Sequence, residues 1–270
     1  MAVSIKDAKR IVVKVGTSSL THKNGNINLG RIEKFARVLS DLQNMGKEIV
    51  LVSSGAIGVG CSRMGLKERP STTKGKQAAA AVGQCHLMNI YSKFFAEYGH
   101  VVAQVLLTRV VIDDKRMRDN VCNTFDTLLE QGIIPIVNEN DAISVDEIEN
   151  LCNFGDNDNL SAIVSILTNA DLLVILSDID GFYNGDPRKD KNAKLITEIL
   201  EITDEVKNCA GEAGTSFGTG GMRTKISAAE KVVAKGVSMV LANGENPSIL
   251  TELLVDDKKI GTLFIGRKEN

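Results

Sequence analysis

The sequence predicts an α/β protein, a three-layer αβα sandwich around a mostly parallel central sheet. Short apolar runs rich in β-branched residues recur along the chain, and stretches with helical periodicity separate most of them. The runs are apolar throughout instead of alternating with polar residues, which is typical of parallel strands covered by helices on both faces. This alternation of runs and helical stretches indicates repeated β-α-β units.

Six runs have the length and composition of buried strands. They span residues 11–15, 49–52, 101–107, 133–137, 172–176 and 239–242. Small or polar residues lie where five of these runs end, at Gly16, Ser53, Asn138, Ser177 and Asn243. Open α/β sheets bind ligands beyond the carboxyl ends of their strands, so we expect the functional site at that edge.

The clearest helical pattern covers residues 29–45. Its apolar face carries Ile32, Phe35, Leu39 and Leu42. The pattern stops at Gly46, which can take the left-handed conformation common just after a helix. The same glycine signal marks three other helix-to-strand joins, at Gly99, Gly132 and Gly236.

Composition predicts one domain over residues 1–270. The chain is 43% hydrophobic and 24% charged, enough for one large core, and no low-complexity linker or repeat divides it. A formal net charge of -2 predicts no binding to nucleic acid or to anionic membranes. The apolar runs are too short to cross a bilayer and the first ten residues lack the apolar segment of a secretion signal, so we expect a cytoplasmic protein. Five scattered cysteines without a CxxC pair predict reduced thiols.

Two loops of small residues follow the first two strands. In residues 14–19, Lys14 precedes a polar turn whose backbone amides, together with the ammonium group, suit a phosphate. A solvated lysine beside an ordinary turn is the alternative, although a lysine in an apolar strand is costly to bury without a partner. Residues 53–60 open a helix whose N-terminus suits carboxylates or phosphates, and close helix packing explains its glycines equally well. Their spacing is not G-x-G-x-x-G, which disfavours a Rossmann oxidoreductase.

The densest polar region combines residues 138–141 with residues 155–159, just before an apolar helix predicted over 160–167. Turn formation and helix capping account for part of this composition. The clustered amides and carboxylates would also suit the ammonium group of an amino acid and would orient nearby lysines. A calcium loop is excluded, because D-x-[DN]-x-[DN]-G is absent.

A glycine-rich segment, residues 218–225, leads into a helix predicted over 226–235. An amide-rich loop that ends in a lysine at a helix start is typical of a phosphate site, and a flexible surface loop is the alternative. It is not a Walker A sequence, because no G-K-[ST] follows at the required spacing. The three histidines, His22, His86 and His100, are isolated, so we expect no protein-held metal and no Cys-His or Ser-His hydrolase.

Together these segments resemble the amino acid kinase family in order and in nearly every motif position, over essentially the whole chain. The matching motifs are residues 12–17, 53–56, 138–141, 155–159, 177–178 and 218–225. Within the family they resemble the branch that uses ATP with Mg²⁺ to phosphorylate the γ-carboxylate of L-glutamate, the first step of proline synthesis.

The resemblance implies a role for each matching residue. Lys14 and Lys225 would contact the transferring phosphoryl group, and Asp158 would orient them. The residues that would hold glutamate are Ser54, Asp141 and Asn157. The residues that would line the ATP site are Lys14, Ser177, Asp178, Thr219, Gly220, Gly221, Met222, Arg223, Thr224 and Lys225. An N-terminal part, about residues 1–165, would bind the amino acid and a C-terminal part, about residues 166–270, would bind ATP.

The resemblance also implies partners. Family members of this branch are commonly tetramers or dimers and are inhibited by proline. We therefore expect a homo-oligomer, proline as a feedback inhibitor and channelling of the product to glutamyl phosphate reductase. The chain resembles a short form, because longer members append a small RNA-binding-like domain of the PUA type.

Two alternatives stay open at this point. Another family member, acting on aspartate, N-acetylglutamate, carbamate or UMP, would share the ATP half, and the segments that begin at Asn138 and Gly155 favour glutamate. The other alternative is a non-catalytic amino-acid or nucleotide sensor on the same fold. The presence of Lys14, Lys225 and Asp158 disfavours it.

Overall fold

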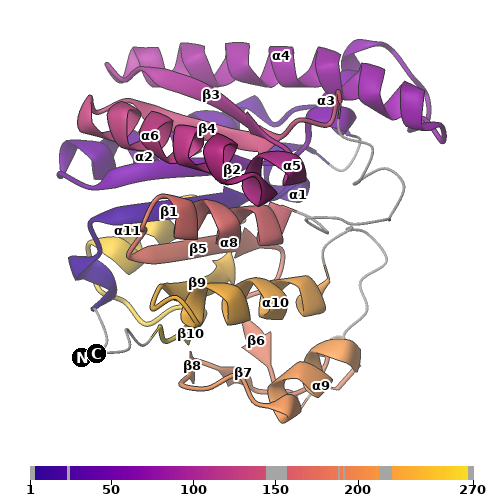
Figure 1. Cartoon of the computed structure of the whole chain (residues 1–270). Coiled ribbons are helices and arrows are strands. Elements are labelled where there is room, and N and C mark those ends of the chain that lie inside the picture. The colour runs from indigo at the N-terminus through magenta and orange to yellow at the C-terminus, as the bar shows by residue number, and fades with distance from the viewer. Residues whose placement is uncertain are drawn as a thin grey trace.

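A computed structural model describes residues 4–22, 25–143, 157–187, 189–190, 192–212 and 221–266. These residues form the predicted αβα sandwich, with a mostly parallel sheet between two layers of helices (Figure 1). The strands of this sheet are β1 (Arg10–Val15), β2 (Glu48–Ser53), β3 (Val102–Leu107), β4 (Ile134–Glu139), β5 (Leu172–Ser177), β8 (Glu198–Ile199), β9 (Ser238–Asn243) and β10 (Thr262–Phe264). A separate small sheet pairs β6 (Phe182–Tyr183) with β7 (Leu195–Ile196).

The main sheet has the strand order β3-β4-β2-β1-β5-β9-β10-β8. The six strands from β3 to β9 are parallel and correspond to the six predicted runs, which confirms that part of the prediction. Strand β10 runs antiparallel to β9, and β8 pairs with β10. Neither was predicted, because strands of two or three residues carry no periodic signal.

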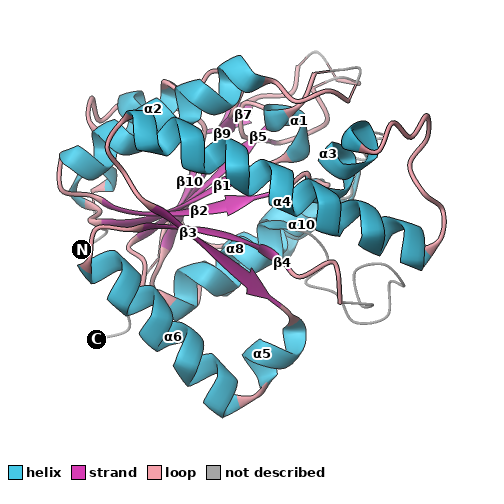
Figure 2. Cartoon of the chain, turned by 90° about the horizontal axis from the view of Figure 1, so that it is seen from above, coloured by secondary structure: helices cyan, strands magenta, loops and turns pink. Residues whose placement is uncertain are grey.

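Helices cover both faces of the sheet (Figure 2). The helical elements are η1 (Ile5–Asp7), α1 (Thr17–Leu20), α2 (Leu29–Asn44), α3 (Ala56–Arg63), α4 (Thr73–Glu97), α5 (Arg109–Asp113), α6 (Lys115–Glu130), α8 (Asn157–Leu167), α9 (Asp204–Glu212), α10 (Met222–Val233) and α11 (Ile249–Leu254). Helices α2, α4 and α11 pack on one face, and α6, α8 and α10 pack on the other. Among the described residues, no helix combines the length and the apolar character needed to cross a membrane.

The central strand β1 is buried on both faces, and its side chains alternate between the two helix layers. Ile11 and Val13 belong to the core under α2 and α4, whereas Val12 belongs to the core under α8 and α10. Because side chains along a strand alternate, Lys14 lies on the same face as Val12. The strand therefore directs this lysine toward α8 and α10.

The predicted helix over residues 29–45 is α2, and Gly46 follows it with φ of +85°, as predicted. The other three predicted glycines, Gly99, Gly132 and Gly236, also have positive φ. Four of the five cysteines lie in the described part of the chain as free thiols, and Cys152 lies outside it.

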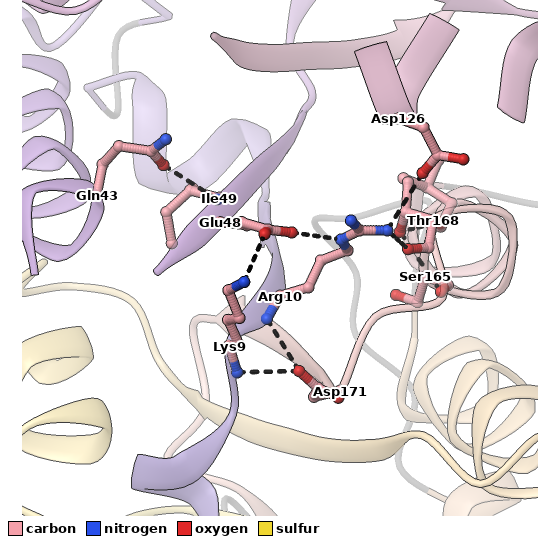
Figure 3. A network of polar contacts seen from close by, with 10 residues as sticks. Lys9, Arg10, Gln43, Glu48, Ile49, Asp126, Ser165, Thr168 and Asp171 are labelled. Carbon is pink, nitrogen blue, oxygen red and sulfur yellow. Dashed lines mark hydrogen bonds and ion pairs between the residues drawn. The ribbon is translucent and has the colours of Figure 1, made fainter. Parts of the chain in front are cut away.

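A network of charged groups joins the strand starts, at the edge opposite the predicted site (Figure 3). The Arg10 guanidinium donates from Nε to Glu48 Oε2 at 2.7 Å and from Nη1 to Asp126 Oδ1 at 3.3 Å. Asp171 Oδ2 accepts from the backbone N–H of Lys9 at 2.9 Å and of Arg10 at 3.0 Å. These contacts connect β1 with β2, α6 and the start of β5.

Helices α3 and α4 touch backbone to backbone. A Cβ atom on Gly83 would lie 1.8 Å from the carbonyl oxygen of Ala56, and one on Gly60 would lie 1.8 Å from that of Ala79. Neither site has room for a side chain. This contact holds α4 against α3, whose first residue is only three positions beyond the end of β2.

We predict that Gly83→Ala lowers the free energy of unfolding by about 1–3 kcal/mol, because the added methyl group meets rigid backbone and the helices must separate. Urea unfolding, compared at equal m, measures this change. Gly30→Ala on α2 is the matched control, since its Cβ would meet only Asn28 Oδ1, at 3.9 Å. Equal stability of the two variants would contradict the close packing of α3 and α4.

Candidate active site

The candidate site lies where the parallel strands end. The carboxyl ends of β1, β2, β4, β5 and β9 point to one edge of the sheet. The polar residues expected there are therefore gathered at one edge, although they are distant in sequence.

Asp158 holds two lysines that come from different elements. The Nζ atom of Lys14, in β1, lies 2.6 Å from Asp158 Oδ1. The Nζ atom of Lys225, in α10, lies 3.1 Å from Asp158 Oδ2. The hydroxyl oxygen of Thr224 is 3.0 Å from Asp158 Oδ2. Four of the predicted residues therefore form one connected group.

This group is buried. The side chain of Lys14 is 10% exposed, that of Lys225 is 7% exposed and that of Asp158 is fully buried. Burial opposes ionisation of Asp158, but the Lys14 and Lys225 ammonium groups outweigh it and hold the pKa of that carboxyl well below its usual range. With one carboxylate for two ammonium groups, the three side chains carry a net positive charge in a place with little water. Such a place favours an anion.

The helices that carry Asp158 and Lys225, α8 and α10, begin earlier than predicted. Helix α8 begins at Asn157, not at residue 160, so Asp158 lies in its first turn, where the helix dipole favours a carboxylate. Helix α10 begins at Met222, not at residue 226, so Lys225 lies within its first turns. The difference arises because polar first turns look like loops in the sequence.

A second polar group surrounds Asn157. Its Nδ2 atom donates to Ser54 Oγ at 2.7 Å, to the carbonyl oxygen of Ser53 at 3.1 Å and to Asn138 Oδ1 at 3.2 Å. This group joins the ends of β2 and β4 to the start of α8. Asn157 directly precedes Asp158, so the two polar groups are adjacent.

A cavity of about 350 Å³ adjoins the second group, because Gln84, which accepts from Asn138, is part of its lining. Its lining comes from α3, α4, β3 and the end of β4: Ala56, Ala80, Ala81, Gln84, Cys85, Met88, Gln104, Leu106, Glu139, Asn140, Asp141 and Ala142. Its volume is within the usual range for small-molecule sites. The buried carboxylates of Glu139 and Asp141 make its wall suitable for an ammonium group.

The remaining predicted residues are placed as follows. Ser177 is buried at the end of β5, and its hydroxyl donates to Asp178 Oδ1 at 3.2 Å. Met222 packs in the core under α10 and can offer the site only its backbone. Arg223 is exposed, and Gly221 is the N-cap of α10. Thr219 and Gly220 lie outside the described residues.

Three residues with polar contacts at the site were not assigned roles from the sequence. Asn138 links Asn157 to Gln84 of α4, through its Nδ2 atom to Gln84 Oε1 at 2.9 Å. Tyr91 of α4 lies 2.9 Å from Ser53 Oγ through its hydroxyl. Burial raises the pKa of the Tyr91 hydroxyl, which keeps it neutral. Asn138 stood in a conspicuous polar motif, whereas Gln84 and Tyr91 have no local signal that separates them from other helix residues.

The chain is similar to known proteins in sequence and in fold. The model of the amino acid kinase family matches residues 9–243. The chain is 65% identical over 268 residues to the glutamate 5-kinase of Clostridium perfringens, covering 99% of each chain. It is 56% identical to the glutamate 5-kinases of Listeria monocytogenes, covering 100% of this chain and 97% of the relative, and of Enterococcus faecalis, covering 98% and 97%. A crystal structure of UMP kinase from Bacillus anthracis matches at a TM-score of 0.62 with 16% identity over 97% of each chain, a likeness of fold.

We predict that Asp158→Asn lowers the free energy of unfolding at neutral pH by about 3–5 kcal/mol, because it removes the carboxylate that pairs with two buried ammonium groups. The pKa of Asp158 is lower in the folded than in the unfolded chain, where it is about 3.9. The stability contributed by this carboxylate is therefore present above about pH 4 and is lost as the pH falls further. Denaturant unfolding from pH 7 to pH 3 should show the difference between the two proteins narrowing below about pH 4.

The control for this measurement is Asp178→Asn, which changes an exposed carboxylate at the same edge of the sheet. We expect it to leave the free energy of unfolding nearly unchanged at every pH. A constant gap between the wild type and Asp158→Asn down to pH 3 would contradict the assignment of an ionised, depressed carboxyl.

Proposed function

This chain belongs to the amino acid kinase family, and we propose that it transfers the γ-phosphoryl group of ATP to the γ-carboxylate of L-glutamate, forming L-glutamyl 5-phosphate and ADP. This is the first step of proline synthesis. The observation that carries the proposal is the buried group of Lys14, Asp158 and Lys225 beside a cavity with acidic walls. The high identity to glutamate 5-kinases selects glutamate as the acceptor.

The residue types fit this reaction. A γ-carboxylate has an unperturbed pKa near 4.3 and is already an anion at neutral pH, so its attack on phosphorus needs no general base. The site must instead bring two anions together and stabilise charge on the transferring phosphoryl group. We assign that task to the ammonium groups of Lys14 and Lys225.

Asp158 acts in this proposal as a positioning residue. Its two oxygens hold the two Nζ atoms, one each, and its depressed pKa keeps it ionised throughout the reaction. In the transfer step, a γ-carboxylate oxygen forms a bond to the γ-phosphorus while the bond from that phosphorus to the β-γ bridging oxygen breaks. The electron pair leaves on ADP, and no proton moves.

The acceptor fits the cavity and its rim. We assign the substrate ammonium group to Asp141, which lines the cavity, and further contacts to Ser54 and Asn157, which are linked to the cavity wall through Asn138 and Gln84. In this arrangement the γ-carboxylate points to the lysines, because Asn157 adjoins Asp158 in the first turn of α8.

The nucleotide fits the other side of the lysines. We assign it to Ser177, Asp178 and the segment from Thr219 to Lys225, which ends in α10, since amide N–H groups at a helix N-terminus bind phosphate. The amino acid then uses the N-terminal part of the chain and ATP the C-terminal part. Mg²⁺ accompanies the nucleotide in this proposal. Among the described residues no three His, Cys, Asp or Glu side chains are grouped so that they could hold a metal.

The predicted homo-oligomer, inhibition by proline, and channelling to glutamyl phosphate reductase stay predictions. So does the cytoplasmic location.

We predict that the purified protein, given Mg-ATP and hydroxylamine, forms γ-glutamyl hydroxamate with L-glutamate. Hydroxylamine traps an acyl phosphate, so the product reports the transfer itself, and ADP release measures turnover in parallel. L-aspartate, N-acetyl-L-glutamate and UMP serve as competing acceptors. Turnover with one of these in place of glutamate would overturn the acceptor, and ADP from none of them would favour a sensor.

We predict that Lys14→Ala and Lys225→Ala each lower kcat by roughly 100-fold or more, because each removes charge stabilisation from the transferring phosphoryl group. Circular dichroism should show that both variants keep the fold. Lys235→Ala, which changes an exposed lysine just after α10, is the control and should keep normal turnover. Near-normal kcat in either of the first two variants would remove that lysine from the mechanism.

A further inference from the structure

Gln84 of α4 ends a chain of three side-chain amides that begins at the candidate active site. Asn157 donates to Asn138 Oδ1 at 3.2 Å, and Asn138 donates to Gln84 Oε1 at 2.9 Å. Gln84 is half-buried and lines the cavity. The chain therefore connects the first turn of α8 to the cavity wall.

One backbone group sets the orientation of all three amides. The carbonyl oxygen of Ser53 accepts at 3.1 Å and cannot donate, so the Asn157 atom facing it is Nδ2. That same Nδ2 faces Asn138, which must present Oδ1. Asn138 then turns Nδ2 toward Gln84, which must present Oε1.

This order gives Gln84 a defined polarity toward a ligand. Its acceptor atom is engaged by Asn138, so the polar atom that it can offer to a bound molecule is Nε2, a donor with two hydrogens. Glu139 and Asp141 in the same cavity are acidic. A hydrogen-bond donor in this wall can bind a negatively charged part of the ligand, which these two carboxylates repel.

An amino-acid ligand has such a negatively charged group, its α-carboxylate. None of the described residues that line the cavity is a lysine or an arginine, so neutral donors must bind that group. Gln104 and Asn140 also line the cavity, but Gln84 is the amide whose orientation the chain from Ser53 sets.

We propose that Gln84 determines specificity for the amino-acid acceptor: Nε2 donates to the α-carboxylate, while Oε1 holds Asn138 and, through it, Asn157. The proposal rests on the proposed function, in which that acceptor is L-glutamate. It assigns α4 a direct part in acceptor recognition.

The test compares L-glutamate with 4-aminobutyrate, which keeps the γ-carboxylate and the amino group but lacks the α-carboxylate. Gln84→Met removes donor and acceptor at nearly constant volume. Gln84→Glu keeps an acceptor for Asn138 and removes the donor. Gln77→Met is the matched control, the same substitution two turns earlier on α4 and outside the cavity lining. Initial rates at subsaturating acceptor give kcat/KM, and thermal unfolding checks that each variant is folded.

We expect Gln84→Met and Gln84→Glu to lower kcat/KM for L-glutamate roughly 10- to 100-fold, mainly through KM, as for loss of a hydrogen bond to a charged group. With Gln84→Glu, kcat/KM for 4-aminobutyrate should change less than about threefold and KM for ATP should not change. Gln77→Met should match the wild type with both acceptors.

Two results would overturn the proposal. Normal kcat/KM for L-glutamate in folded Gln84→Glu would show that no donor is needed at this position. Equal losses with both acceptors in that variant would show that Gln84 only supports the fold of the site. A wild type that does not phosphorylate L-glutamate would instead refute the proposed function, so the two failures are distinguishable.

Discussion

The contact of one buried carboxylate, Asp158, with two buried lysines connects the packing of this structure to the charge of its site. An ammonium group is stable in the interior only beside a negative charge, and Asp158 supplies that charge to both Lys14 and Lys225. The three residues come from β1, α8 and α10, so the packing of these elements and the charge balance of the site require each other. A shift of either helix would separate charges that have little access to water.

The parallel sheet determines where the other residues of the site lie. Parallel strands end at one edge, and the helices that follow them begin there, so side chains at strand ends meet backbone N–H groups at helix starts. The opposite edge carries the network of Arg10, Glu48 and Asp126, which connects strand starts instead (Figure 3). The structural ion pairs and the candidate active site thus lie at opposite ends of the same strands and use different residues.

Helix α4 contributes through the closeness of its packing. Gly60 and Gly83 allow α3 and α4 to touch along their backbones, which brings Gln84 and Tyr91 to the ends of β4 and β2. Both contacts are made to residues that also hold Asn157 or its neighbours. The wall of the cavity and the inner polar groups therefore form one hydrogen-bonded unit, in which the carbonyl oxygen of Ser53 sets the orientation of the amides.

The class of fold, the six main strands and the helix ends could be predicted from the sequence, because these depend on local periodicity and on glycine. It also marked Lys14 as costly in an apolar strand, and its ordered motifs pointed to the amino acid kinase family. The exposed or polar first turns of α8 and α10 were missed, because Asn157 and Arg223 resemble loop residues. Two contacts became visible only in the folded chain: Gln84 meets Asn138, 54 residues away, and Tyr91 meets Ser53, 38 residues away. Such pairings depend on how helices pack across the sheet, and no local pattern along the chain encodes that distance.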